Sequence, residues 1–488
     1  MLSNHSESFI STEKDNSDIE VQPAIRNNQL KRNLIKIIVL SEVGMIIGFN
    51  LVVFNPLGEV LLREVHGLDK HEIKAAKGDV NMLFSLGSLF GALVAGLISE
   101  KLGRKRFIVI SDVFILCTIG LYWIENLYVL YLARFLVGFF SCSQQTVTNI
   151  MLTEILPRSI SGIGNAVVYT FTASFIFVGF IQGSLFTDVQ IVKYWRCILC
   201  WPIIPQILKL IALPFILKFE SPRHYFAQHR RSTNLEINMA MIFADTYPTE
   251  DVKTITSETL RVLEEQEESK IGGGLCSALG YFVSSHTRKR MVTGCFLLIG
   301  QQMTGLTYYS LYSTDIFDRI SHEGKKITFF IAGVKLLAGF VAIITMKSFG
   351  RKFNLIVSNH MQAVCSMLIV LSIQMKWPWI SYIAGPAYMF FLATGYGSCI
   401  NAYVTEILPA SAASFCIAIG WIAQASIAKI IPLIAEDLGD ANMMLFFAVT
   451  CFIWVFILDY FLVETRDKLE SRVIQQFKTR PYSLFNFE

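Results

Sequence analysis

Several polar side chains stand inside long apolar stretches of this sequence, where they could bind a polar solute. Gln301 and Gln302 are adjacent in the segment Gly300–Ser310. An amide both donates and accepts hydrogen bonds, as a polyhydroxylated ligand requires. In lipid two adjacent amides are costly unless they face a cavity or a partner. We therefore expect both to line a solute path, with a structural hydrogen bond between helices as the alternative.

Lys335 stands about nine residues into the apolar stretch ITFFIAGVKLLAGFVAIITM. A lysine at the centre of a membrane span costs about 2.5–3.5 kcal/mol on insertion scales. Its ammonium could bind an anionic group of a substrate, or pair with a buried carboxylate such as Glu42. The third interpretation is that the side chain extends to the membrane surface.

Other polar side chains recur at helical spacing and predict further parts of a binding surface. Tyr308 shares a helical face with Gln301 and Thr304. Asn401 lies on a second polar face with Thr405. Packing between helices is the alternative at each of these positions.

These side chains must be positioned by helices that cross a membrane. The sequence is 53% hydrophobic and only 16% charged, whereas a soluble domain carries about 25% charged residues. A bilayer requires about 20 mainly apolar residues per helix, and the apolar runs lack the alternation of strands. We predict an all-α membrane protein with twelve spans, at about 34–57, 81–99, 106–123, 127–149, 162–185, 193–218, 291–312, 326–346, 353–374, 378–403, 411–435 and 441–463.

The spans divide six and six around one charged segment. Such a division is typical of two repeated halves with a substrate site between them near the midplane. The predicted order is a disordered tail at 1–33, a six-helix half at 34–218, a helical linker at 219–290, a second half at 291–463 and a tail at 464–488.

Lysines and arginines near the span ends predict the orientation. They crowd the second connection, at Arg104 and Lys105, and the eighth, at Arg351 and Lys352. We expect both termini and the linker to be cytoplasmic, in a multi-pass protein of the plasma membrane.

The sequence favours no other class of function. It has no nucleotide-binding loop, no HExxH motif and no basic stripe interleaved with aromatics, so we expect no enzyme, no cofactor and no nucleic-acid partner. The ten cysteines are scattered, without the spacing of a metal site. The expected partners are a small-molecule solute, with a sugar the favoured class, and the lipid bilayer; the oligomeric state is left open.

Several motifs follow one another along the chain, and two of them occur twice. GRK recurs at Gly103–Lys105 and Gly350–Lys352, and TEILP recurs at Thr153–Pro157 and Thr405–Pro409. Four more are ARFLVG around Arg134 and Gly138, FESPRHY at Phe219–Tyr225, GQQMTGLTYYS at Gly300–Ser310 and VETRDKLE at Val463–Glu470. Together they resemble the sugar porter family of the major facilitator superfamily, over about residues 35–470.

The resemblance implies a cytoplasmic latch, in which charged side chains hold the halves together while the cavity opens outward. The positions that match are Glu100, Arg104, Arg134, Glu154, Glu220, Arg223, Arg351, Glu406 and Glu464. Ser161, Ala413 and Ser414 stand where the family has Arg, Arg and Gly, and Lys347 stands where it has a carboxylate. The latch of the second half is therefore expected to be weaker than in relatives.

The pocket departs from the family's pattern at several positions. Thr307 and Lys335 stand where relatives have Asn, Tyr169 where they have Gln, and Asn401 and Ala425 where glucose carriers have Trp. A glucose specificity therefore does not follow from the resemblance.

Asn50 occupies the position where proton-coupled members carry Asp. An amide cannot exchange a proton at physiological pH, which favours facilitated diffusion, while Glu42 leaves symport open. The predicted function is a carrier of a sugar or related solute by alternating access. The alternatives are a proton symporter, a carrier of an anionic metabolite, and a non-transporting nutrient sensor, which the short segment after Glu464 disfavours.

Overall fold

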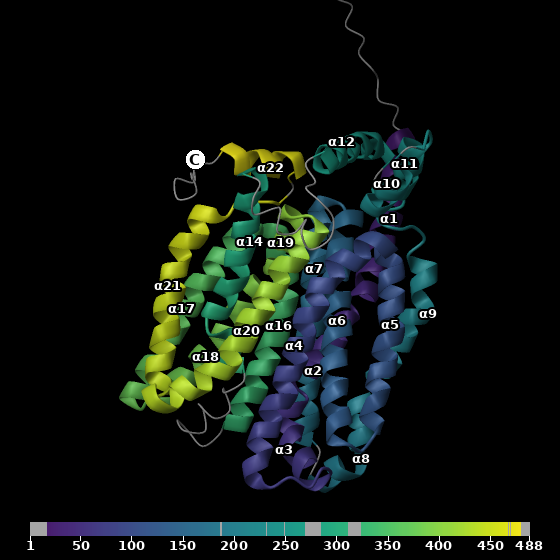
Figure 1. Cartoon of the computed structure of the whole chain (residues 1–488). Coiled ribbons are helices and arrows are strands. Elements are labelled where there is room, and N and C mark those ends of the chain that lie inside the picture. The colour runs from purple at the N-terminus through teal and green to yellow at the C-terminus, as the bar shows by residue number, and fades with distance from the viewer. Residues whose placement is uncertain are drawn as a thin grey trace, which may run out of the picture.

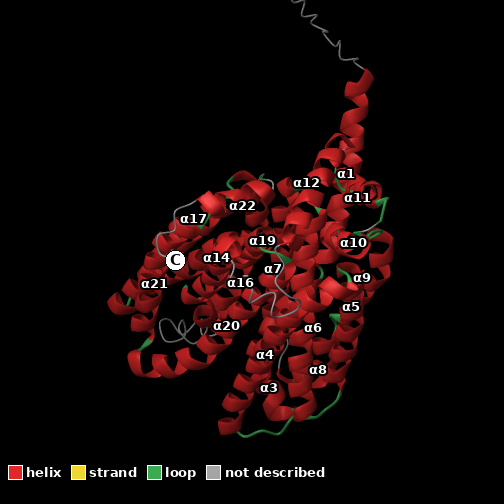
Figure 2. Cartoon of the chain, turned by 45° about the horizontal axis from the view of Figure 1, so that its top comes forward, coloured by secondary structure: helices red, strands yellow, loops and turns green. Residues whose placement is uncertain are grey.

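Long apolar helices run through most of the chain, as a computed structural model shows. It describes residues 17–479 apart from 186–187, 231, 248, 269–284, 311–323, 467 and 469. The described part contains helices and no strand (Figure 2). Ten of its helices are long and apolar enough to cross a bilayer.

The first half contains six membrane crossings, some of them made of two consecutive helices. Its helices are α1 (Ser17–Ser41), α2 (Val43–Val52), α3 (Phe54–Glu64), α4 (Lys70–Leu102), α5 (Arg104–Gly120), the 3₁₀ turn η1 (Leu121–Trp123), α6 (Leu127–Ile155), α7 (Arg158–Leu185), α8 (Asp188–Cys200) and α9 (Ile203–Ile216).

The second half follows the same plan. Its helices are α14 (Ser285–Met303), α16 (Gly324–Ser348), α17 (Arg351–Met375), α18 (Pro378–Leu392), the π-helical turn η2 (Ala393–Gly397), α19 (Ser398–Ile407), α20 (Ala410–Leu438) and α21 (Asp440–Phe461).

Two crossings of the second half are interrupted, and they complete the twelve that the sequence predicts. After Met303 the chain turns at Gly305, whose φ is +88°, and a short helix resumes at 306–310. A β-carbon at Gly305 would lie 2.7 Å from the ring of Phe447, so only glycine fits this kink. The other interruption is η2, between α18 and α19.

Short helices gather at one end of the bundle, which we call the linker end (Figure 1). They are α10 (Pro222–His229), α11 (Leu235–Ala244), α12 (Thr249–Glu268) and α22 (Glu470–Thr479). The Asp245 carboxylate after α11 lies 2.6 Å from Lys36 Nζ and 3.6 Å from Arg32 Nη1, both on α1. These ion pairs fix the linker against the first helix.

Helix boundaries differ from expectation at three places. α1 begins at Ser17, inside the segment 1–33 that we expected to be disordered, and α22 lies inside the expected tail 464–488. Side chains of α1 between Gln29 and Lys36 contact the linker. α14 begins at Ser285, before the predicted start of the second half at residue 291.

The two halves meet mainly along two helix pairs, α4 with α20 and α7 with α16, and α19 also packs against α7 and α6. Glycines allow the close approach. A β-carbon at Gly96 of α4 would lie 2.6 Å from Ser414 Oγ of α20. On the other pair, Thr170 Oγ1 of α7 donates to Gly339 O of α16 at 2.9 Å. This interface positions the side chains that could contact a solute.

Candidate functional site

Tyr169 extends from α7 of the first half onto the interrupted crossing of the second half. Its ring lies against Gly397 in η2, where a β-carbon would be 2.2 Å from Tyr169 Cζ. The hydroxyl Oη is buried and has no hydrogen-bond partner among the described residues. A buried hydroxyl without a partner is costly, so Tyr169 presents an unused polar group at the interface between the halves.

Lys335 lies on the inward face of α16. Leu337 and Ile344, which are 63% and 65% exposed, lie on the opposite face, toward lipid. Gly339, one turn from Lys335, contacts α7. The lysine is half-buried, and it has no ion pair or hydrogen bond to a described residue. The ion pair with Glu42 that we considered is absent, because Glu42 pairs with another lysine.

Two amide side chains of the second half likewise have no hydrogen-bond partner among the described residues. Gln301 on α14 and Asn401 on α19 are half-buried, and neither side chain bonds to a described residue. Gln302 and Thr307 instead bond to one another, with Thr307 Oγ1 donating to Gln302 Oε1 at 2.7 Å. This bond spans the kink at Gly305, so these two side chains stabilise the interruption.

Tyr308 does not share a face with Gln301 as the helical spacing predicts. It is buried in the core of the second half, with its ring 5.9 Å from that of Phe447 on α21. The turn at Gly305 breaks the helical register between the two residues. Tyr308 therefore packs within its own half and is buried in this arrangement, and its contact with a substrate stays a prediction.

Asn50 is fully engaged by protein groups. Its Oδ1 accepts from Tyr122 Oη at 3.1 Å and from Arg134 Nη1 at 3.3 Å, and its Nδ2 donates to Ile46 O at 2.9 Å. It therefore positions Arg134 and is not open to a solute, contrary to its predicted place in the binding surface.

Arg134 also differs from expectation, because it lies far from the latch. It precedes Glu154 by twenty residues of α6, which is about 30 Å along a helix. The guanidinium is buried, donates to Asn50 O at 2.9 Å, and lies 4.7 Å and 4.8 Å from the ring centroids of Phe54 and Phe84. The neutral amide of Asn50 thus stands where a carboxylate would balance this charge.

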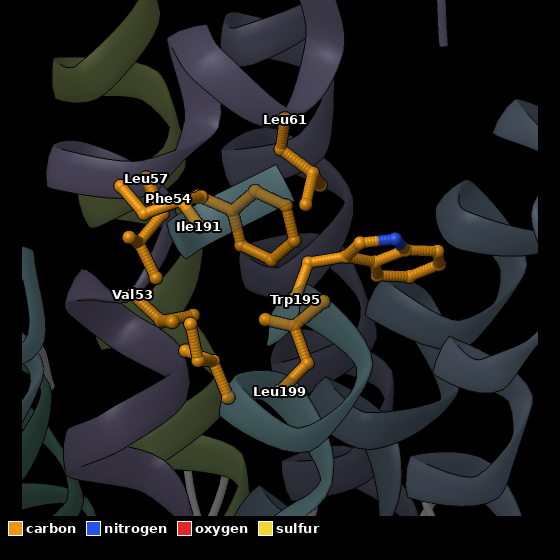
Figure 3. Close-up of a pocket in the computed structure, with 8 residues that line it drawn as sticks. Val53, Phe54, Leu57, Leu61, Ile191, Trp195 and Leu199 are labelled. Atoms are coloured by element: carbon orange, nitrogen blue, oxygen red, sulfur yellow. The ribbon is translucent and has the colours of Figure 1, made fainter. Parts of the chain in front are cut away.

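A separate pocket lies between α2, α3 and α8, at the end opposite the linker (Figure 3). It is lined by Val53, Phe54, Leu57, Leu61, Ile191, Trp195, Ile198 and Leu199. A sugar site needs hydrogen-bonding groups, and this lining is apolar, so we assign it no part in the solute path.

At the linker end of the first half, charged groups connect three helices. Arg104 Nη2 of α5 lies 3.0 Å from Glu154 Oε1 of α6, and Arg223 Nε of α10 lies 3.8 Å from the same oxygen. Glu220 accepts from the backbone N–H groups of Lys105 at 3.0 Å and Arg106 at 3.2 Å. A carboxylate at a helix N-terminus satisfies free N–H groups and the helix dipole.

The second half repeats this arrangement. Arg351 Nη2 lies 2.8 Å from Glu406 Oε1, and both side chains are buried. Glu464 accepts from the backbone N–H groups of Arg351 at 2.9 Å and Lys352 at 3.0 Å. The repeated sequence motifs therefore build the same helix-end structure twice.

The contacts across the halves differ from the expected latch. Ser161 Oγ of α7 donates to Glu406 Oε1 at 3.3 Å. A β-carbon on the neighbouring Gly162 would lie 2.4 Å from Arg351 Nη2. The ion pairs described above each lie within one half, whereas a hydroxyl and a glycine make contact across them. Glu100 contributes its backbone carbonyl, 3.1 Å from His224 Nδ1.

One charged cluster was missed by the sequence reasoning. Lys209 Nζ of α9 lies 2.8 Å from Asp112 Oδ1 of α5 and 3.2 Å from Glu42 Oε2 between α1 and α2. The signal was available, because Lys209 and Asp112 are charged residues inside predicted spans. Only the structure shows that these side chains contact one another.

Known carriers share sequence with most of this chain. The model of the family described as sugar (and other) transporter matches residues 36–471. The probable metabolite transport protein CsbC of Bacillus subtilis (strain 168) is 23% identical over 421 residues, covering 83% of this chain and 87% of that protein. Solute carrier family 2, facilitated glucose transporter member 9 of Pongo abelii is 25% identical over 422 residues, covering 82% and 71%.

Solved structures of one carrier share the fold. The major facilitator superfamily proton:xylose symporter XylE bound to 6-bromo-6-deoxy-D-glucose superposes with a TM-score of 0.79 at 16% identity, covering 92% of this chain and 100% of that chain. The inward open conformation of XylE from E. coli gives a TM-score of 0.65 at 16% identity, covering 91% and 99%.

Proposed function

The chain belongs to the sugar (and other) transporter family and is a multi-pass membrane carrier; from this premise we propose that it moves a sugar or related polyhydroxylated solute by facilitated diffusion. Alternating access of the two halves around a site at their interface is the proposed mechanism.

One observation supports a sugar as the solute. Tyr169 lies against η2 of the other half, Lys335 is on the inward face of α16, and Gln301 and Asn401 are half-buried. The polar groups of these four side chains are not used by described protein partners. Hydroxyls, amides and an ammonium donate, and the first two also accept, which matches the hydroxyl groups of a sugar. A curated relative named as a facilitated glucose transporter is consistent with this class.

Facilitated diffusion is favoured by the environment of Asn50. The buried Arg134 is held by an amide and by backbone carbonyls, so this position has no carboxylate to take up and release a proton.

The location and orientation are part of the proposal. We place the carrier in the plasma membrane with the linker end in the cytoplasm. Arg104, Lys105, Arg351 and Lys352 all lie at that end, at the starts of α5 and α17, as the distribution of positive charge near span ends requires.

Uptake into liposomes tests the proposal. The purified protein should bring labelled hexoses, pentoses or polyols to equal concentrations on both sides, and an imposed proton gradient should not drive accumulation. Gln301→Ala should weaken substrate affinity about two- to tenfold, because one hydrogen bond contributes about 0.5–1.5 kcal/mol. Gln374→Ala, at an exposed position of α17, is the matched control. Proton-driven accumulation would refute the proposed mechanism.

Lys335 supports a second candidate, a carrier of an anionic metabolite, because its ammonium has no described counter-ion. Lys335→Asn should then lower affinity for acidic sugars and spare neutral ones, since a hydrogen bond to a charged group contributes about 1.5–3 kcal/mol. Competition of uptake by neutral and acidic sugars, at equal surface expression, separates the two candidates. Equal loss for both classes would exclude an anion-specific role.

A further inference from the structure

Five polar side chains meet inside the membrane-spanning part of the first half, away from the proposed solute path. They are Glu42, Asp112, Gln144, Gln206 and Lys209. The side chains of Lys209, Asp112 and Glu42 are only 1%, 0% and 7% exposed. On α9 the neighbours Leu208 and Ile211 are exposed toward lipid, so Lys209 is directed inward.

The charges of this cluster do not balance. Two carboxylates face one ammonium, which leaves one negative charge if both acids are ionised. A buried charge without a partner is strongly unfavourable. The described ionisable groups that face Glu42 are Lys209 of α9 and Asp112 of α5, and the neutral Gln144 of α6 donates to Asp112. One additional proton makes the cluster neutral.

The hydrogen bonds distinguish the two carboxyl groups. Asp112 Oδ1 forms an ion pair with Lys209 Nζ at 2.8 Å and accepts from the side-chain amides of Gln144 and Gln206. Two amide donors and an ammonium therefore surround the carboxyl group of Asp112. Glu42 has Lys209 at the longer distance of 3.2 Å, and neither of its oxygens has a hydrogen-bond partner among the described residues.

Several buried polar atoms of the cluster have no hydrogen-bond partner in the described part of the chain. They are the oxygens Asp112 Oδ2, Gln144 Oε1 and Gln206 Oε1, and the ammonium nitrogen Lys209 Nζ. A hydroxyl on Glu42 would add a donor for one of these oxygens, and buried polar groups are stable when hydrogen-bonded.

We propose that the cluster of Glu42, Asp112 and Lys209 is a site for one resident proton, bound on Glu42 at neutral pH and retained throughout the transport cycle. The four elements that hold it all belong to one half, so alternating access does not separate them. This inference agrees with facilitated diffusion but does not depend on it.

Infrared spectroscopy tests the proton directly and needs no substrate. At neutral pH the spectrum of the unmodified carrier minus that of Glu42→Gln should contain the carbonyl band of a protonated carboxylic acid. Glu59→Gln, at an exposed position of α3, should give no such band. Absence of the band from the first difference spectrum would overturn the proposal.

Unfolding and uptake supply the second test. Glutamine resembles a protonated glutamate, so Glu42→Gln should leave the unfolding temperature nearly unchanged and the uptake rate within about twofold of that of the unmodified carrier. Asp112→Asn should lower the unfolding temperature more, because it removes the ionised partner of Lys209. Loss of uptake in a normally folded Glu42→Gln carrier would show that the carboxyl group exchanges its proton, and would also overturn the proposal.

Discussion

The two halves of this carrier share a framework at their helix ends and differ inside the membrane. Arg104 with Glu154 in the first half corresponds to Arg351 with Glu406 in the second, and a carboxylate caps the helix that each arginine begins. Positions inside the membrane can be matched between the halves by counting residues from these arginines and glutamates.

Eight residues after the arginines stand Asp112 and Asn359, and ten residues before the glutamates stand Gln144 and Tyr396. Gln144 donates to Asp112 in the ionised cluster of the first half. In the second half Tyr396 Oη lies 3.5 Å from Asn359 Oδ1, and both groups are neutral. The comparison teaches that one backbone plan accommodates either an ionic or a neutral polar interior.

The largest expected effect comes from breaking the ionic interior. Lys209→Met leaves two buried carboxyl groups without their cation and should lower the free energy of unfolding by about 3–5 kcal/mol. Thermal unfolding in detergent measures this loss. Lys193→Met, at an exposed position of α8, should change stability little; equal effects would show that the cluster is not a stabilising unit.

Removal of the helix-end arginine should have different effects in the two halves. Arg104→Ala and Arg351→Ala each remove one partner of a buried ion pair, at a cost of about 3 kcal/mol. Only Arg351 also contacts α7 across the interface, at Gly162. Hydrogen exchange at the linker end of α7 should therefore increase more in Arg351→Ala. The same exchange in both variants would contradict this asymmetry.

A smaller change tests the contact across the halves. Gly162→Ala places a methyl group 2.4 Å from Arg351 Nη2, and overpacking costs about 1–3 kcal/mol. The linker end should open more readily, which slowed uptake and faster hydrogen exchange would reveal. Gly164→Ala is the matched control, because its β-carbon would meet the flexible side chains of Leu156, at 3.1 Å, and Leu152, at 3.6 Å.

The smallest effect is expected in the neutral interior. Tyr396→Phe removes one long hydrogen bond to Asn359 and should cost about 0.5–1.5 kcal/mol. Its unfolding temperature should lie well above that of Asp112→Asn, measured in the same detergent. A larger drop in unfolding temperature for Tyr396→Phe than for Asp112→Asn would contradict this order of effects.

The sequence by itself determined the membrane class, the twelve crossings and the family. Hydropathy is a sum over neighbouring residues, so Lys335 and the apolar run around it can be recognised without knowing what surrounds the helix. The recurring GRK and TEILP motifs likewise identified the helix-end charges, because each is a local arrangement built near a connection.

Only the tertiary structure decided which side chains meet. Lys209, Asp112 and Glu42 come from three crossings that are far apart in sequence, and their contact depends on the rotation of each helix. The same applies to Arg134 and Asn50, whose pairing removed Arg134 from the predicted latch. The kink at Gly305 turned Tyr308 away from Gln301. Helical periodicity predicts a face within one uninterrupted helix, whereas packing between helices determines what that face contacts.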